Sequence, residues 1–126
     1  MSEDRAPIAL ETYELALLRR TRQAREFDEE TIERIFLEHR DYTLGLVASG
    51  QQLAAGPVSG SPAEDERICG MGLYQQGSLD KVRDLLNGDP GVRQGLYRFD
   101  VMTWRTPAGR ITFPSPPPAN ARTPGS

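Results

Sequence analysis

Two side chains of this chain, His39 and Asp89, are of the types that enzymes use for proton transfer. His39 is the only histidine among the 126 residues, and it lies in the apolar stripe of a segment with helical spacing. Asp89 directly precedes Pro90, after a second helical segment. A carboxylate that accepts the Nδ1 proton of an imidazole leaves Nε2 available as a general base or acid. We therefore expect a proton-transfer pair if the fold brings the two residues together.

Each of the two residues also has a simpler explanation. A lone histidine on the apolar face of a helix is commonly satisfied by a backbone carbonyl or a carboxylate. An aspartate before a proline commonly opens a turn by accepting hydrogen bonds from the backbone that follows it. The alternative hypothesis is therefore a non-catalytic module that binds a small ligand or a partner, in which His39 and Asp89 only hold a helix against a loop.

Other kinds of site find less support in the sequence. One histidine and one cysteine, Cys69, do not provide the ligand spacing of a zinc site, so no metal is expected. Ser49 and Ser59 have no neighbouring base that would activate a serine nucleophile. Haem ligation by His39 is compatible with its apolar surroundings, but nothing else in the sequence favours it. We expect no cofactor.

The composition limits the class of protein. A length of 126 residues with 37% hydrophobic residues suits one small domain. The net charge of −3 offers no basic surface for nucleic acid. Cys69 has no partner for an internal disulfide, the first residues lack the pattern of a signal peptide, and no apolar run is long enough to span a bilayer. Nearly all of the positive charge is arginine and Ala, Gly and Pro are plentiful, so we expect the source to be a GC-rich bacterial genome. From the single cysteine, the first residues and the lack of a long apolar run we expect a cytoplasmic protein with no membrane partner, and from the net charge no nucleic-acid partner.

Hydrophobic patterning predicts six elements in the order βαββαβ. Four strands are expected over residues 13–18, 51–58, 67–76 and 96–104, and two helices over 28–50 and 78–88. The segment RRTRQARE between the first strand and the first helix is expected to be a charged loop. This order folds most simply into a ferredoxin-like α+β domain, with an antiparallel sheet and both helices on one face.

The other face of that sheet predicts a homodimer. The runs YELALL and RICGMGLYQQ are apolar at both alternating positions, so both faces of these strands need to be covered. A second copy of the chain, related by a two-fold axis, would cover the second face. We assign residues 1–113 to the domain and residues 114–126 to a disordered, proline-rich tail.

Two longer segments resemble the YCII-related family of dimeric α/β-barrel proteins. They are HRDYTLGLVASGQQLAAGPV, which begins at His39, and DPGVRQGLYRFDVMTW, which begins at Asp89, and the resemblance covers about residues 13–105. It implies a ferredoxin-like fold that dimerises into a barrel, with His39 and Asp89 as the active-site pair. Gly91 stands where the family has a bulky residue, which predicts a wider pocket wall here.

The resemblance also implies a class of chemistry. Relatives that include dehydrochlorinases and muconolactone-isomerase-like proteins point to a cofactor-independent isomerase, lyase or cyclase acting on a small aromatic or enolisable molecule. We expect Gly56, Pro57 and Tyr97 to line the substrate pocket. The alternative for Tyr97 is that its ring fills the core or the dimer interface.

Overall fold

The structure is a computed structural model that describes residues 8–62 and 65–114. The elements along the chain are β1 (Leu10–Arg20), a 3₁₀ helix η2 (Arg22–Glu26), α1 (Glu29–Ala48), β2 (Ala54–Pro57), β3 (Ile68–Tyr74), α2 (Leu79–Asn87), α3 (Pro90–Arg93) and β4 (Tyr97–Pro107). Of the tail expected over residues 114–126, all but Pro114 lies outside the described residues.

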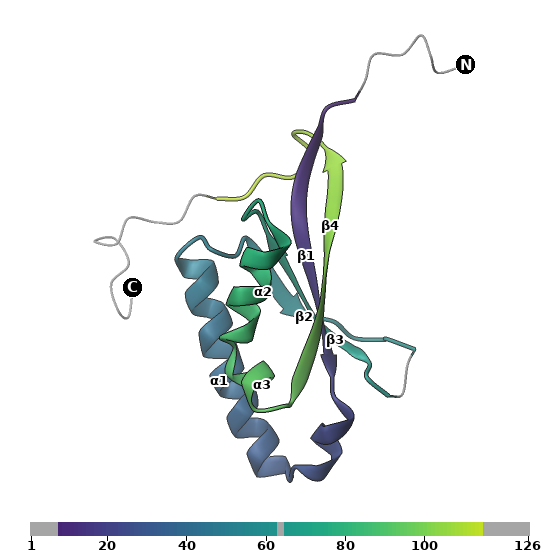
Figure 1. The fold of residues 1–126 in the computed structure, drawn as a ribbon, viewed down its shortest axis with the longest axis vertical. Coiled ribbons are helices and arrows are strands. Elements are labelled where there is room, and N and C mark those ends of the chain that lie inside the picture. Colours follow the sequence, from purple (N-terminus) through teal and green to yellow (C-terminus); the bar gives the residue numbers. More distant parts are fainter. Residues whose placement is uncertain (1–7, 63–64, 115–126) are drawn as a thin grey trace.

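The four strands form one antiparallel sheet in the order β2-β3-β1-β4. Figure 1 shows the helices on one side of this sheet, with α1 and α2 side by side. The ferredoxin-like α+β fold expected from the sequence is thus confirmed, and β1 and β3 are the two central strands. This arrangement places the middle of α1 next to α3, which follows α2.

Local sequence signals set the ends of the two long helices. The Asp28 side chain accepts a hydrogen bond from the backbone N–H of Thr31 at 2.8 Å, and so caps the start of α1. Gly50, with φ of 82°, follows the end of α1 in the left-handed conformation that glycine tolerates. The Ser78 side chain accepts from two backbone N–H groups at the start of α2. These boundaries agree with the sequence-based prediction.

Two connections differ from the prediction. The segment RRTRQARE is not simply a loop, because Arg19 and Arg20 pair with β4 and extend β1, and η2 follows behind a cap formed by Thr21. The Asp-Pro segment is also more than a turn: Asp89 is the N-cap of the short helix α3. A four-residue helix has too few positions for hydrophobic periodicity to reveal it.

The core lies between the sheet and the helices. Even-numbered residues of β1 face the helices, and Ala16 and Leu18 are buried there. One cluster gathers Leu18 with Ile35 of α1, and a neighbouring cluster gathers Ala16 with Val82 of α2. Burial of these aliphatic side chains is what holds both helices on the sheet.

The opposite face of the sheet carries apolar side chains that this chain leaves partly uncovered. Leu15 and Leu17 point to this side with Met71, Met102 and Trp104 from the neighbouring strands, since directly paired residues share a face. Met71, Met102 and Trp104 are 45%, 38% and 37% exposed. The prediction that β1 and β3 are apolar on both faces is therefore confirmed.

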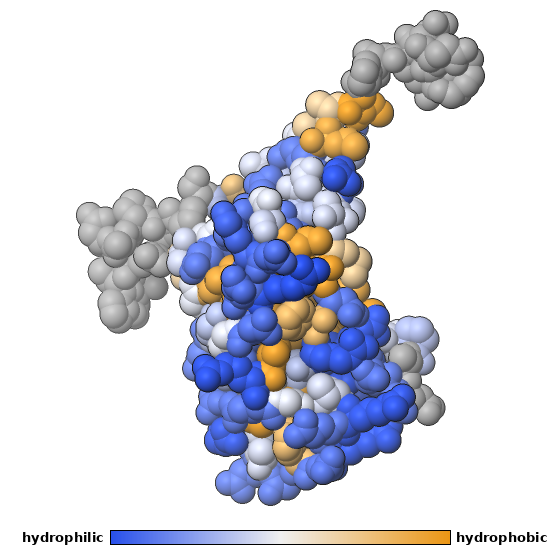
Figure 2. All heavy atoms as spheres, in the orientation of Figure 1, coloured by the Kyte–Doolittle hydropathy of each residue, from blue (hydrophilic) through white to orange (hydrophobic). Residues whose placement is uncertain are grey.

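One end of the sheet narrows to a two-stranded ribbon. β1 pairs with β4 from Leu10 to Arg20, whereas it pairs with β3 only from Glu14 onward. Figure 1 shows this ribbon projecting beyond the helices, and Figure 2 shows hydrophobic surface where β1 starts. Leu10 is 53% exposed there.

Candidate active site

The structure brings His39 and Asp89 together. His39 projects from the middle of α1, and its Nδ1 atom lies 2.6 Å from Oδ2 of Asp89. The other carboxylate oxygen of Asp89 accepts a hydrogen bond from the backbone N–H of Gly91 at 2.8 Å. An ionised carboxylate only accepts hydrogen bonds, so Nδ1 is the donor in this contact, and in the neutral imidazole Nε2 then carries the lone pair. No described residue forms a hydrogen bond with Nε2.

The pair is held in a largely enclosed position. The Asp89 side chain is 2% exposed and that of His39 is 16% exposed. A buried carboxylate is stable only when donors satisfy its oxygens, and here each oxygen has one donor. The imidazole lies between two aromatic rings, with centroids 4.9 Å from Tyr97 and 6.4 Å from Phe36. The orientation of the imidazole is therefore fixed by its hydrogen bond and by packing.

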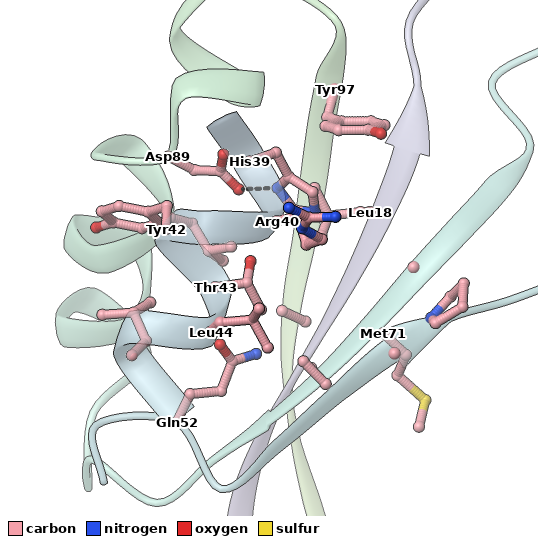
Figure 3. A pocket seen from close by; sticks show the side chains of 18 of the residues that line it. Leu18, His39, Arg40, Tyr42, Thr43, Leu44, Gln52, Met71, Asp89 and Tyr97 are labelled. Atoms are coloured by element: carbon pink, nitrogen blue, oxygen red, sulfur yellow. Dashed lines mark hydrogen bonds and ion pairs between the residues drawn. The ribbon is translucent and has the colours of Figure 1, made fainter. Parts of the chain in front are cut away.

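A cavity of about 230 Å³ adjoins this pair. It lies between α1 and the β2–β3 side of the sheet, as Figure 3 shows. Gly56, Pro57 and Tyr97, the expected pocket residues, line it together with His39 and Asp89. Small residues such as Ala16 and Gly70 form its floor on the sheet. A cavity of this size suits a small organic molecule.

Three tyrosines around the pair are held in the protonated form. Burial raises the pKa of Tyr97 to about 12, and burial also raises the pKa of Tyr74 above its ordinary range. The pKa of Tyr42 is raised by burial and then by the charge of Asp89, and its hydroxyl donates to the carbonyl of Leu85 at 2.6 Å. At neutral pH these hydroxyl groups are hydrogen-bond donors and not bases, so the three tyrosines are not proton acceptors in the cavity.

Cys69 also lines the cavity, as a thiol. Burial raises its pKa, and its Sγ lies 3.5 Å from the carbonyl oxygen of Leu18. A protonated, half-buried thiol is a poor nucleophile. Among the described residues, no group of three or more His, Cys, Asp or Glu side chains is placed to hold a metal ion.

The expectation that Gly91 widens the pocket is wrong. A Cβ at this position would lie 2.5 Å from Cδ2 of Tyr97 and 3.2 Å from Cβ of His39. The ring of Tyr97 thus occupies the space that a side chain at position 91 would need. Gly91 permits close packing around the pair and does not enlarge the cavity.

Several lining residues were not identified from the sequence. Phe36 is 45% exposed and contributes to the cavity wall, as do Arg40 and Thr43. The spacing of Phe36 and Thr43 from His39 on the helix was a usable signal, because residues three or four apart share a face.

The sequence contained no comparable signal for Gln52, which also lines the cavity. It follows another glutamine, Gln51, and only its burial in the structure distinguishes the two: Gln52 is 4% exposed and Gln51 is exposed. The Oε1 atom of Gln52 is buried and has no hydrogen-bond partner among the residues that the structure describes. An unpaired buried polar atom costs about 1–3 kcal/mol of stability.

With the fold and the cavity established, comparison with known proteins identifies the class. The model of the YCII-related domain matches residues 14–105. The chain therefore belongs to the YCII-related domain family, as its two motifs suggested. No curated protein matches it in sequence.

A solved structure confirms the fold. The 5-chloro-2-hydroxyhydroquinone dehydrochlorinase from Burkholderia phenoliruptrix AC1100, in complex with 2,5-dihydroxybenzoquinone, superposes with a TM-score of 0.50 at 17% sequence identity. The match covers 75% of this chain and 93% of that chain. Within the part of this chain that the structure describes, no helix has the length and apolar character needed to cross a membrane.

Proposed function

We propose that this protein is a cofactor-independent enzyme that moves a proton on a small organic molecule bound in the cavity. The observation that carries the proposal is the 2.6 Å contact between His39 Nδ1 and Asp89 Oδ2 at the wall of a cavity of about 230 Å³. A histidine oriented by a buried carboxylate, with its second nitrogen unpaired, is the arrangement that general acid–base catalysis requires.

The proposed roles follow from the hydrogen bonds. Nε2 of His39 removes a proton from the substrate, and the carboxylate of Asp89 stabilises the imidazolium that forms. In an isomerisation or cyclisation the imidazolium returns the proton at another atom of the substrate. In an elimination such as dehydrochlorination, the electron pair left on carbon expels chloride and the proton passes to solvent.

The structural neighbour supports the small-molecule part of this proposal. This neighbour is a dehydrochlorinase of a chlorinated hydroxyhydroquinone, with a dihydroxybenzoquinone bound. Isomerase, lyase and cyclase activities on aromatic or enolisable molecules all remain within the proposed class. A non-catalytic binding module with a structural His39–Asp89 pair is the alternative.

Binding of a probe tests whether the cavity is a ligand site. We expect 2,5-dihydroxybenzoquinone to shift the NMR resonance of Nε2 of His39 and the amide resonances of Gly56 and Gly70, which line the cavity. Residues of α2 that face solvent, such as Arg83, should be unaffected. The proposal fails at this step if the shifts map to another surface or if no resonance of the cavity responds.

We also propose that the protein functions as a homodimer joined through the open face of the sheet. The partly exposed Leu15, Leu17, Met71, Met102 and Trp104 share this face on three neighbouring strands. Monomers rarely expose large contiguous apolar patches. A two-stranded ribbon such as the end of β1 and β4 is also only marginally stable without a packing partner. A second copy would cover both features.

A further inference from the structure

Gln52 is a buried polar residue of the cavity that the proposed proton transfer does not use. Its side chain lines the cavity, is 4% exposed, and forms no hydrogen bond with any described residue. Buried amides in proteins are normally paired, so an unpaired one among the residues that line a cavity is a candidate for contact with a molecule bound there. Figure 3 shows Gln52 at the end of the cavity away from His39.

The backbone around Gln52 holds the side chain in place. The N–H of Gln52 donates to the carbonyl of Leu46 at 3.1 Å, and the N–H of Leu53 donates to the carbonyl of Leu73 at 2.8 Å. The carbonyl of Gln51 accepts from the side chain of Gln76 at 2.6 Å. Three consecutive residues are thus tied to α1, β3 and the segment after β3. Only the amide of Gln52 remains available.

Gly72 gives the amide its position on the sheet. A Cβ at Gly72 would lie 2.3 Å from Nε2 of Gln52, so only a residue without a side chain leaves room for the amide there. Rotation of the amide about its last bond is soft, and a half-turn exchanges the donor and the acceptor. The amide can therefore donate to a carbonyl oxygen or accept from a hydroxyl.

The separation of His39 and Gln52, the polar residues at the two ends of the cavity, limits the length of a ligand that contacts both. Gln52 is bonded to Leu46, which lies seven residues after His39, or about 10 Å along the axis of α1. This separation is between backbone positions, and both side chains line the same cavity. A single six-membered ring with an oxygen substituent at each end, and one hydrogen bond to the protein at each, is a ligand of this scale.

We propose that Gln52 is the second polar anchor of the substrate site, and that the substrate is a single ring that carries oxygen substituents at opposite positions. One oxygen, or the carbon beside it, faces His39, and the other is hydrogen-bonded by the amide of Gln52. Between them the ring lies against apolar and small residues of the cavity. This inference rests on the proposed function, since it assumes that the cavity binds the substrate.

Two probes of nearly equal shape test the anchor: hydroquinone, kept under nitrogen, and 4-methylphenol, in which a methyl group replaces one hydroxyl. Their dissociation constants are measured by NMR titration of the full chain and of Gln52→Met, a substitution of similar size that removes the amide. We expect the preference for hydroquinone over 4-methylphenol to fall by about tenfold in Gln52→Met, the effect of one hydrogen bond.

Gln51→Met is the matched control. The Gln51 side chain is exposed and bonds only to Ser49, so this variant should keep the preference of the natural chain. Gly72→Ala should also reduce the preference for hydroquinone over 4-methylphenol, because the added Cβ displaces the amide of Gln52 without changing residue 52. Gln52→Met removes an unpaired buried group, so we expect it to fold at least as stably as the natural chain.

The outcomes separate the anchor from the proposed function. One outcome is that both probes shift resonances of the cavity while the preference is the same in the natural chain and in Gln52→Met. In that case Gln52 does not anchor the ligand, and the proposal that the cavity binds a ligand is kept. If neither probe shifts these resonances, the anchor and the proposed function fail together. A loss of preference in Gln52→Met with no loss in Gln51→Met supports the anchor.

Discussion

His39 and Asp89 lie fifty residues apart in the chain, and a 2.6 Å contact between Nδ1 and Oδ2 joins them. The contact connects the middle of α1 to the N-cap of α3, so a single carboxylate orients the imidazole and also starts a helix. A substitution can separate these two roles, because orienting the imidazole requires the negative charge of Asp89 and capping the helix does not.

Asp89→Asn should fold but lose most activity. The asparagine oxygen can still accept from the N–H of Gly91, since asparagine is as good an N-cap as aspartate. Its amide nitrogen would face His39 as a donor, which favours the tautomer with the proton on Nε2 and removes the base. We expect the rate to fall by about 10²–10⁴-fold with a near-unchanged melting temperature. Equal rates would show that the carboxylate has no part in the chemistry.

Gly91→Ala should destabilise the protein. The added Cβ would lie 2.5 Å from the ring of Tyr97 and 3.2 Å from Cβ of His39, so the packing around the pair must shift. Overpacking of this kind costs about 1–3 kcal/mol. The control is Gly45→Ala on the exposed side of α1, where a Cβ meets nothing within 4 Å and alanine should stabilise the helix by about 0.5–1 kcal/mol. Urea unfolding compares the two, and an unchanged stability of Gly91→Ala would contradict this packing.

Tyr97 predicts a loss of stability at alkaline pH. Burial raises the pKa of Tyr97 to about 12 in the folded state, whereas an unfolded tyrosine titrates near pH 10. The folded state binds the phenolic proton more tightly, so this contribution is complete below pH 10 and is lost as the pH rises toward 12. It amounts to about 3 kcal/mol at most. Unfolding free energies from pH 9 to 11 should fall less steeply in Tyr97→Phe, and parallel curves would contradict the expectation.

The open sheet face predicts a mass of twice 14.0 kDa in solution. Leu17→Glu places a charge in the middle of this face, between Met71 and Asp100 on the flanking strands, and should yield monomers in sedimentation equilibrium. Leu37→Glu is the control, because Leu37 is 39% exposed on α1, on the helical side of the sheet. A natural chain that stays at 14.0 kDa at micromolar concentration would exclude the dimer.

The parts of the fold that local chemistry decides could be predicted from the sequence. Asp28, Gly50 and Ser78 mark helix ends through hydrogen bonds or backbone conformations that belong to single residues, and these predictions are confirmed. Apolar residues at both alternating positions indicated that β1 and β3 are central strands. The fold order followed from the element types, and the resemblance to the YCII-related family implied that His39 and Asp89 form a pair.

Other features depend on contacts that no local pattern contains. Arg19 and Arg20 are strand residues because β4 lies beside them, although their charges favour a loop. Gly91 was misread because the ring that fills its space comes from Tyr97, on the next strand. Gln51 and Gln52 are the same residue type in adjacent positions, and only the packing of α1 on β3 buries one of them.

The most direct test of the central claim is the turnover of small enolisable rings by the natural chain and by His39→Gln. Glutamine is similar in size and can still donate to Asp89, so the variant removes the base and keeps the packing. The assays are chloride release from 5-chloro-2-hydroxyhydroquinone and double-bond migration in β,γ-unsaturated cyclic ketones. We predict turnover of at least one of these by the natural chain and a fall of about 10²–10⁴-fold in His39→Gln. Equal rates in the two proteins, with both folded, would contradict the proposal that His39 moves the proton.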